Sequence, residues 1–362
     1  MKNTLLYIGL ALTLASGICS CSDETIYAVV DNQPQPSTYR PIDYVTSQIN
    51  NNQLGNCVSD ENYDYLQYYE ADHLKLYRRE RATGQLTQLT EIRDVTKGTD
   101  ALFCNFSLKG DYLYFILFNG NDPDRRNVLC RVRTDGRGLM ESICNFGLQF
   151  GSIHYVGDNT YVKLYGSGSE PGAFARLDPE TGETTPLFNT DKTTEFVYDG
   201  YVYSHDYHNQ DGKFYMQLYR CRLDGTQSEL VWDDPDCTNF RATIWNGKLC
   251  LADIYNNTVY LADADGKNRR VLLEDTRIVS MNAYYDNLYF YTEGGTCTAG
   301  LYLYRQGYDR PMLLAAEANF NIGPIVNSHG EVWFTLPTEE SANSRFGQLH
   351  YVDTKHRLCE IK

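Results

Sequence analysis

Short runs of alternating apolar and polar residues recur along the chain, and tight-turn dipeptides separate them. In the clearest example, residues 258–262 form a β-rich run, Asp265-Gly266 supplies a turn, and residues 271–273 return. Glycine adopts positive φ at little steric cost, and aspartate can bond its own backbone, so this pattern predicts a β-hairpin. Variants of the hairpin follow one another from about residue 53, which predicts a chain built from antiparallel strand pairs.

The hairpins repeat with a period in the forties. The turn that precedes an aromatic-rich strand recurs at Gly110, Asp158, Gly200, Gly247, Asn287 and Gly330. Four antiparallel strands per period are typical of a β-propeller blade, and blades stacked in a ring bury both faces of each sheet. We therefore predict an all-β fold in which residues 53–362 form a single β-propeller of four-stranded antiparallel blades. Seven blades are preferred, the first at residues 56–92; six or eight stay open.

Three of the turns carry a resemblance to known propellers. Residues 134–139, 223–227 and 264–273, each with an Asp-Gly turn, resemble the hairpins of the YWTD propellers of low-density-lipoprotein receptors. Residues 53–362 are more similar to bacterial lipoproteins with such a propeller, the domain of unknown function 5050 family. The Tyr-Trp-Thr-Asp motif itself is missing, the nearest sequence being Trp333-Phe334-Thr335, and receptor propellers have six blades. The resemblance implies the fold and a Bacteroidetes-type lipoprotein, and it transfers no receptor partner.

Residues 1–20 have the pattern of a lipoprotein signal peptide. Lys2 precedes an apolar run at residues 5–14 that is too short to span a bilayer. Ile18-Cys19-Ser20-Cys21 resembles a bacterial lipobox, which implies cleavage before Cys21 and lipidation of its thiol; ordinary secretion is the alternative. Ser22-Asp23-Glu24 resembles the acidic export signal of Bacteroidetes surface lipoproteins. We expect a lipid anchor in the outer membrane with the domain at the cell surface, or otherwise facing the periplasm.

Residues 21–52 separate this anchor from the repeats. Pro34, Pro36 and Pro41 stand among Gln, Asn, Ser and Thr residues, a composition that predicts a flexible tether. Residues 26–30 are the exception, because they could add one strand to the propeller and close its ring.

Charge and cysteine content narrow the partners. The formal net charge is −15, which disfavours nucleic acid and anionic membrane surfaces because both need clustered Lys and Arg. Membrane contact is then expected through the acyl chains alone.

The eleven cysteines include no C-x-x-C pair, so a zinc site is disfavoured. Most are expected to be small buried residues, and a disulfide such as Cys130–Cys144 stays open.

The loops predict two unlike faces. In a propeller, the connections from first to second strand and from third to fourth strand lie on one face of the ring, and here they are nearly all tight turns. The other connections are long and polar and would form an elaborated face. Binding residues usually lie on loops held by a rigid scaffold, so we expect recognition there, at the channel mouth. The longest of these loops are residues 119–127, 166–172, 205–212, 293–300 and 338–347.

The elaborated face gathers the candidate ligand-binding residues. Arginine forks bind carboxylate or sulfate groups in a bidentate manner, and aromatic rings stack on sugars, so a glycan or an acidic partner protein would fit. The alternative is that each Arg pairs with a nearby acid and that Phe packs between blades. The candidates are Arg125, Arg126, Tyr207, Phe240, Arg241, Arg277 and Arg345.

Signals for catalysis or metal binding are weak. His205 and His208 lie three residues apart beside Asp206 and Asp211, but solvated turn residues are the simpler interpretation. Residues 233–236 are acidic without the alternating spacing of a calcium loop. The sequence lacks a nucleophile-elbow, P-loop or Rossmann motif, and we predict neither catalytic residues nor a cofactor.

These observations favour a binding module over an enzyme. We expect a monomeric domain at the cell envelope that binds a glycan, a peptide or an envelope protein. The alternatives are a hydrolase or lyase acting on polysaccharide, whose acid and base would converge from several blades, and a non-catalytic scaffold of an outer-membrane complex.

Overall fold

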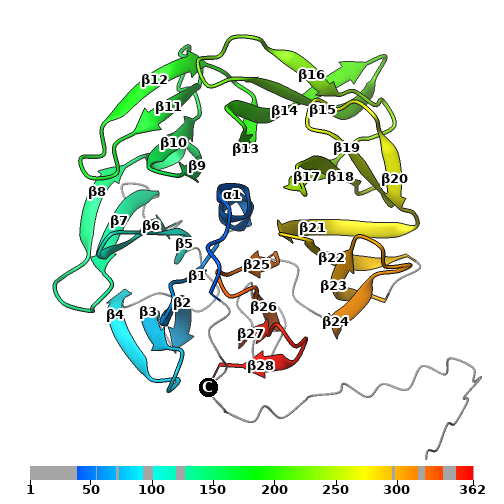
Figure 1. Cartoon of the computed structure of the whole chain (residues 1–362). Helices are drawn as coiled ribbons and strands as arrows, with labels where there is room; N and C mark the ends of the chain where they lie inside the picture. Colours follow the sequence, from blue (N-terminus) through cyan, green and yellow to red (C-terminus); the bar gives the residue numbers. More distant parts are fainter. Residues whose placement is uncertain are drawn as a thin grey trace, which may run out of the picture.

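Seven four-stranded antiparallel sheets stand in a ring in the computed structural model, which describes residues 39–53, 55–70, 73–92, 101–119, 127–295, 298–316, 323–336 and 348–361. Seen along the axis of the ring, the first strand of each sheet lies innermost and the fourth lies at the rim (Figure 1). The predicted seven-bladed β-propeller is confirmed, and the first blade begins where the repeat places it.

Each blade takes four consecutive strands of the chain. Blades 1 to 4 comprise β1 (Cys57–Ser59), β2 (Tyr63–Glu70), β3 (His73–Glu80) and β4 (Leu86–Ile92); β5 (Ala101–Lys109), β6 (Tyr112–Asn119), β7 (Val128–Arg133) and β8 (Glu141–Asn145); β9 (Phe150–Val156), β10 (Asn159–Leu164), β11 (Ala173–Leu177) and β12 (Thr184–Asn189); β13 (Thr193–Tyr198), β14 (Tyr201–Gln210), β15 (Lys213–Arg222) and β16 (Glu229–Trp232). Blades 5 to 7 comprise β17 (Phe240–Trp245), β18 (Lys248–Asp253), β19 (Thr258–Asp263) and β20 (Arg270–Leu273); β21 (Thr276–Tyr284), β22 (Asn287–Gly295), β23 (Gly300–Arg305) and β24 (Met312–Ala316); β25 (Ile325–Val326), β26 (Val332–Leu336), β27 (Gln348–Val352) and β28 (Leu358–Glu360). The described residues also contain two helical elements: a helix in the centre of the ring, and the 3₁₀ turn Gly147–Gln149 between blades 2 and 3.

The hairpins depend on turns with positive φ at both central residues. Asp199 and Gly200 have φ of 50° and 75°, and Asn246 and Gly247 have 51° and 71°. Such turns match the twist of the flanking strands, which is why Asn-Gly and Asp-Gly pairs favour them. Asp211 and Gly212 form the same kind of turn, so β14 and β15 continue as strands through a segment that the sequence analysis assigns to a loop, residues 205–212.

Gly266, in the turn between β19 and β20, meets the neighbouring blade directly. Its φ is +81°, and a Cβ atom there would lie 1.9 Å from the backbone oxygen of Val231 at the outer edge of blade 4. Gly182 and Gly225 meet the outer strands of their preceding blades in the same way, at Cys144 and Phe188. The glycine of this turn therefore serves blade packing as well as turn geometry.

Substituting Gly266 is expected to cost more than substituting a glycine of the same conformation in open space. Gly307→Ala, at φ +89° with nothing within 4 Å, should cost only the left-handed strain of about 1 to 2 kcal/mol. Gly266→Ala should cost about 1 to 3 kcal/mol more, because Val231 must move to admit the methyl group. Urea unfolding of both variants measures the difference, and equal losses would contradict the role of Gly266 in packing.

Apolar side chains fill the spaces between blades. The described residues form seven hydrophobic clusters, and each cluster joins one pair of neighbouring blades around the ring. Both faces of each sheet are thereby covered, which a single blade could not achieve. The eight described cysteines are all free; six of them are buried, and five of these six belong to the clusters. Cys130 and Cys144 are not bonded to each other.

The ring closes between blades 7 and 1 through side chains, since neither blade borrows a strand from the other. Cys57 and Leu66 of blade 1 pack against Ile325, Trp333 and Leu349 of blade 7. Beside this cluster, the guanidinium of Arg81 contacts the Asp64 carboxylate of its own blade at 2.6 Å. It also contacts both carboxylate oxygens of Glu331 in blade 7, at 2.6 and 2.9 Å.

A helix occupies the centre of the ring (Figure 1). The helix α1 spans Tyr44–Asn52, and Asp43 caps it by accepting hydrogen bonds from the backbone N–H groups of Val45 and Thr46. A helix of nine residues is marginal in isolation, so its stability comes from the surrounding blades. The composition of residues 21–52 predicts a flexible tether; for residues 44–52 that prediction is wrong, because their polar side chains bond the channel wall. The β-rich residues 26–30 lie outside the described residues.

No helix in the described part of the chain is long and apolar enough to cross a membrane.

Candidate binding surface on the long-loop face

The amide side chains of α1 bond the inner edges of opposite blades. Gln48 donates from Nε2 to the carbonyl of Val197 at 3.0 Å and accepts from the N–H of Val197 at 2.7 Å. Asn50 likewise donates from Nδ2 to the carbonyl of Val326 at 2.7 Å and accepts from the N–H of Val326 at 2.8 Å. Each amide thus satisfies both backbone groups of one inner-strand residue, as a neighbouring strand would. The helix links blade 4 to blade 7 across the channel.

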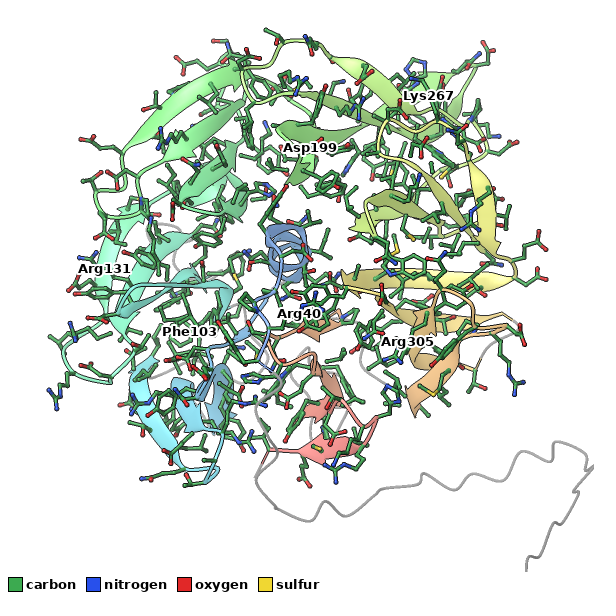
Figure 2. The ribbon with its side chains drawn as sticks, in the orientation of Figure 1. Arg40, Phe103, Arg131, Asp199, Lys267 and Arg305 are labelled. Atoms are coloured by element: carbon green, nitrogen blue, oxygen red, sulfur yellow. The ribbon has the colours of Figure 1, made fainter. Side chains whose placement is uncertain are left out.

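The direction of α1 distinguishes the two faces of the ring. Ahead of the helix, the Arg40 N–H donates to Ser328 and the Tyr44 hydroxyl accepts from Asp199, both residues of tight turns. Asp199 lies at the inner edge of its blade in Figure 2. At the other end, Gln53 donates to the carbonyl of Met281. We call the face with the turns between first and second strands the tight-turn face, and the opposite face the long-loop face.

A chain of side chains beside α1 has the order of a nucleophile, a base and an orienting group. Ser152 Oγ lies 2.7 Å from His154 Nε2, and His154 Nδ1 lies 3.1 Å from Gln48 Oε1. Because Gln48 Oε1 is an acceptor, His154 carries its proton on Nδ1 and accepts from Ser152 at Nε2. Burial lowers the pKa of His154 to about 3. Such a weak base does not activate a hydroxyl near neutral pH, so this chain positions α1.

His154 is expected to make the protein less stable in acid. Its pKa is lower in the folded than in the unfolded state, where it is about 6.5, so the unfolded chain binds more protons between these values. Stability is therefore present above about pH 6.5 and is lost as pH falls, by up to about 1.4 kcal/mol per pH unit. His154→Asn keeps a donor for Gln48 and removes the titration, so its unfolding free energy should fall less steeply between pH 6 and 4. His208→Asn, at an exposed imidazole, is the control and should keep the wild-type slope.

Two candidate arginines lie on the first strands of neighbouring blades, near the long-loop face. Arg241, in β17, donates from Nε to the carbonyl of Val279 in β21 at 3.1 Å. Arg277, in β21, pairs with Glu293 at 3.2 Å, and both side chains are partly exposed. Arg241 thus links the two inner strands that carry these arginines. Arg277 pairs with a nearby acid, which is the alternative to ligand binding that the sequence leaves open. Arg125, Arg126 and Arg345 lie outside the described residues.

The two candidate rings have different environments. Phe240 is 1% exposed and packs in the cluster between blades 4 and 5, so its ring is part of the core and does not face a ligand. Tyr207 is 60% exposed, because β14 extends beyond the other second strands. His205 contacts both rings, with centroid distances of 5.7 Å to Tyr207 and 6.3 Å to Phe240.

Three further exposed rings lie on this face and are not among the candidates predicted from the sequence. Phe214 follows the turn of the β14–β15 hairpin and is 63% exposed, and Tyr255, at the turn between β18 and β19, is also 63% exposed. Tyr165, after β10, is exposed as well. The available signal is a bulky aromatic residue beside a turn between second and third strands, where no neighbouring blade covers it.

The histidines and acids considered for metal binding have other partners. His205 bonds Glu195 through Nδ1, Asp206 pairs with Lys192, and His208 contacts the ring of Tyr215. Asp234 accepts from the N–H of Asp236, as in an ordinary acidic turn. Among the residues that the structure describes, no group of three or more His, Cys, Asp or Glu is arranged to hold a metal ion.

Comparisons with known proteins show the fold alone. No protein-family model and no curated protein matches the chain. Solved structures match at low identity. The β-propeller domain of the Trilobed protease from Pyrococcus furiosus, described as having an open velcro topology, matches with a TM-score of 0.59 and 13% identity over 85% of this chain and 96% of that one. The Pyrococcus horikoshii acylaminoacyl peptidase matches with a TM-score of 0.58 and 12% identity over 84% of this chain and 52% of that one, and TolB from Acinetobacter baumannii with a TM-score of 0.50 and 12% identity over 81% and 77%. The chain spans about half of that peptidase and 35% of the tricorn protease, which it also resembles.

Proposed function

We propose that this chain is a lipid-anchored protein of the cell envelope that binds a glycan or a protein partner through the long-loop face of its propeller. The observation that carries the proposal is that several aromatic side chains on that face are exposed, and that the face also carries the exposed Arg241. Aromatic residues and arginine dominate recognition sites because they supply large contact areas and directed hydrogen bonds. The remaining connections of the described chain are tight turns, which offer less surface for recognition.

The path of the N-terminal segment supports an orientation on the membrane. The chain reaches the channel from the tight-turn face, where Arg40 bonds Ser328 and its guanidinium lies 3.2 Å from the ring centre of Tyr285. An anchor at Cys21 would be 18 residues before Tyr39, about 60 Å at full extension. This tether attaches on the tight-turn side, so it favours an arrangement in which the long-loop face points away from the membrane.

A photo-crosslinking residue placed in intact cells tests the binding face. At position 207 it should form an adduct with a glycan or a protein of the envelope. At position 267 it should not, because Lys267 lies in an exposed turn at the rim on the tight-turn face (Figure 2). Equal adducts from both positions, or adducts from position 267 alone, would contradict the proposal.

External protease tests the location separately. Degradation of the domain on intact cells supports surface exposure, whereas full protection would place the domain in the periplasm.

A further inference from the structure

The β14–β15 hairpin presents two exposed rings on the same side. Tyr207 pairs with Met216, and Asn209 pairs with Phe214. Directly paired residues and those two positions along a strand share one face of a sheet, so Tyr207 and Phe214 lie on one side. That side faces blade 5, because Met216 packs in the cluster between blades 4 and 5.

Two polar contacts tie this hairpin to blade 5. Lys213 pairs with Asp236 at 2.5 Å, and Asn256 donates to the backbone carbonyl of Asp236 at 2.9 Å. Asp236 lies in the connection between β16 and β17, so these contacts hold the hairpin that carries Phe214 and the turn that carries Tyr255 against the same connection. Tyr207 and Phe214, on the side of the hairpin that faces blade 5, and Tyr255, in the β18–β19 turn of blade 5, are exposed rings beside the boundary between blades 4 and 5, and we call these three residues the aromatic row.

Arg241 lies on the inner strand β17, on the channel side of this row, and no acid among the described residues neutralises its positive charge. Its described contacts are all with neutral oxygens: the carbonyls of Val279 and Phe240 and the side-chain oxygen of Asn239. Arg277 differs, because Glu293 already neutralises it. A guanidinium fixed by neutral acceptors keeps its charge available to an anion from solution, and carboxylate is the anion that its planar fork fits.

The chemistry of the aromatic row fits a sugar chain better than an apolar protein surface. The rings are separated by polar groups, namely Asp236, Asn256 and Asn209, and do not merge into one apolar patch. A pyranose has an apolar C–H face that stacks on an aromatic ring and hydroxyls that bond such neighbours. We infer that the aromatic row and Arg241 bind a saccharide chain that carries carboxylates, with a sugar ring on Tyr207 and a carboxylate on Arg241. This inference rests on the proposed binding function and specifies its ligand.

Calorimetry with the whole chain after Cys21 tests the inference. The probes are a hexuronate oligosaccharide and the same oligosaccharide with its carboxylates reduced to alcohols. The acidic form should bind more tightly. Arg241→Gln should weaken its binding about tenfold or more and leave the neutral form little changed, because only the charged hydrogen bonds are lost. Tyr207→Ala should weaken both forms. Tyr308→Ala, at an exposed ring on the tight-turn face, should change neither.

The failure of this inference is distinct from the failure of the proposed function. If neither oligosaccharide binds while position 207 crosslinks to an envelope protein, the saccharide assignment is wrong and the binding face stands. Equal binding of the two oligosaccharides, unchanged in Arg241→Gln, would overturn the role of Arg241. All three positions are exposed, so each variant is expected to fold, and thermal unfolding of each variant checks this.

Discussion

Gln48→Met is expected to destabilise the protein by about 3 kcal/mol or more, although it preserves side-chain volume and helix propensity. The substitution removes the partners of the Val197 N–H and carbonyl groups and of His154 Nδ1, in a site where Gln48 is fully buried. A buried polar group left without a partner costs about 1 to 3 kcal/mol. Urea unfolding followed by circular dichroism measures the loss.

A neighbouring residue of the same helix supplies the control. Ser47 is only half-buried, and its described hydrogen bond, from its backbone N–H to the Asp43 carbonyl, does not involve the side chain. Ser47→Ala should therefore change the free energy of unfolding by less than about 0.5 kcal/mol. A chain that begins at residue 53 should be less stable than Gln48→Met, because it also loses the burial of Val45 and Ile49. If Gln48→Met matched wild type, α1 would occupy the channel without stabilising it.

Arg81→Met is expected to lower the free energy of unfolding by about 3 to 5 kcal/mol. It leaves the Asp64 carboxylate, which is fully buried, and the nearly buried Glu331 without their shared counter-charge. Breaking one side of a buried ion pair costs this much because the remaining charges stay desolvated. Arg79 still contacts Asp64 at 3.2 Å, so the loss should fall mainly on the link to blade 7. Hydrogen exchange should show blades 1 and 7 losing protection before the others.

Two further variants separate this effect from a general loss of surface charge. Arg357→Met breaks a partly exposed pair with Asp353 and should cost less than about 1 kcal/mol. Adding Glu331→Gln to Arg81→Met should recover part of the loss, because one of the two uncompensated carboxylates disappears. A double variant less stable than Arg81→Met would contradict the electrostatic explanation of the seam.

The propeller could be predicted because its signals are local. Asp-Gly and Asn-Gly pairs specify turns over two residues, and they recur often enough to fix the number of strands in each blade. The same local logic is incomplete at Asp211-Gly212, where the polar residues before the turn indicate a loop and yet form a strand. Their pairing partners, residues 213–217, lie just beyond the turn, so strand pairing prevails over polarity.

The helix in the channel could not be predicted by periodicity. An amphipathic stripe forms when a helix has one buried side, whereas blades surround α1, and Gln48 and Asn50 are buried by bonding backbone groups. Asparagine and glutamine in a short segment therefore indicate a tether when the partners are unknown. Phe240 shows the converse limitation, since a ring beside a predicted loop gives no sign that the next blade covers it.

The link between Asn50 and Val326 spans 276 residues, and it sets an order of events during biosynthesis. Residues 44–52 leave the ribosome before any blade, yet they cannot complete their bonds to the channel wall until the seventh blade supplies its inner strand. A newly synthesised chain would thus keep this segment unattached to blade 7 while six blades assemble, and would complete the ring only when its C-terminal residues arrive. Contacts so distant in sequence slow folding and leave the open ring exposed to aggregation in the interval. Loss of even the last few strands should therefore affect the whole ring.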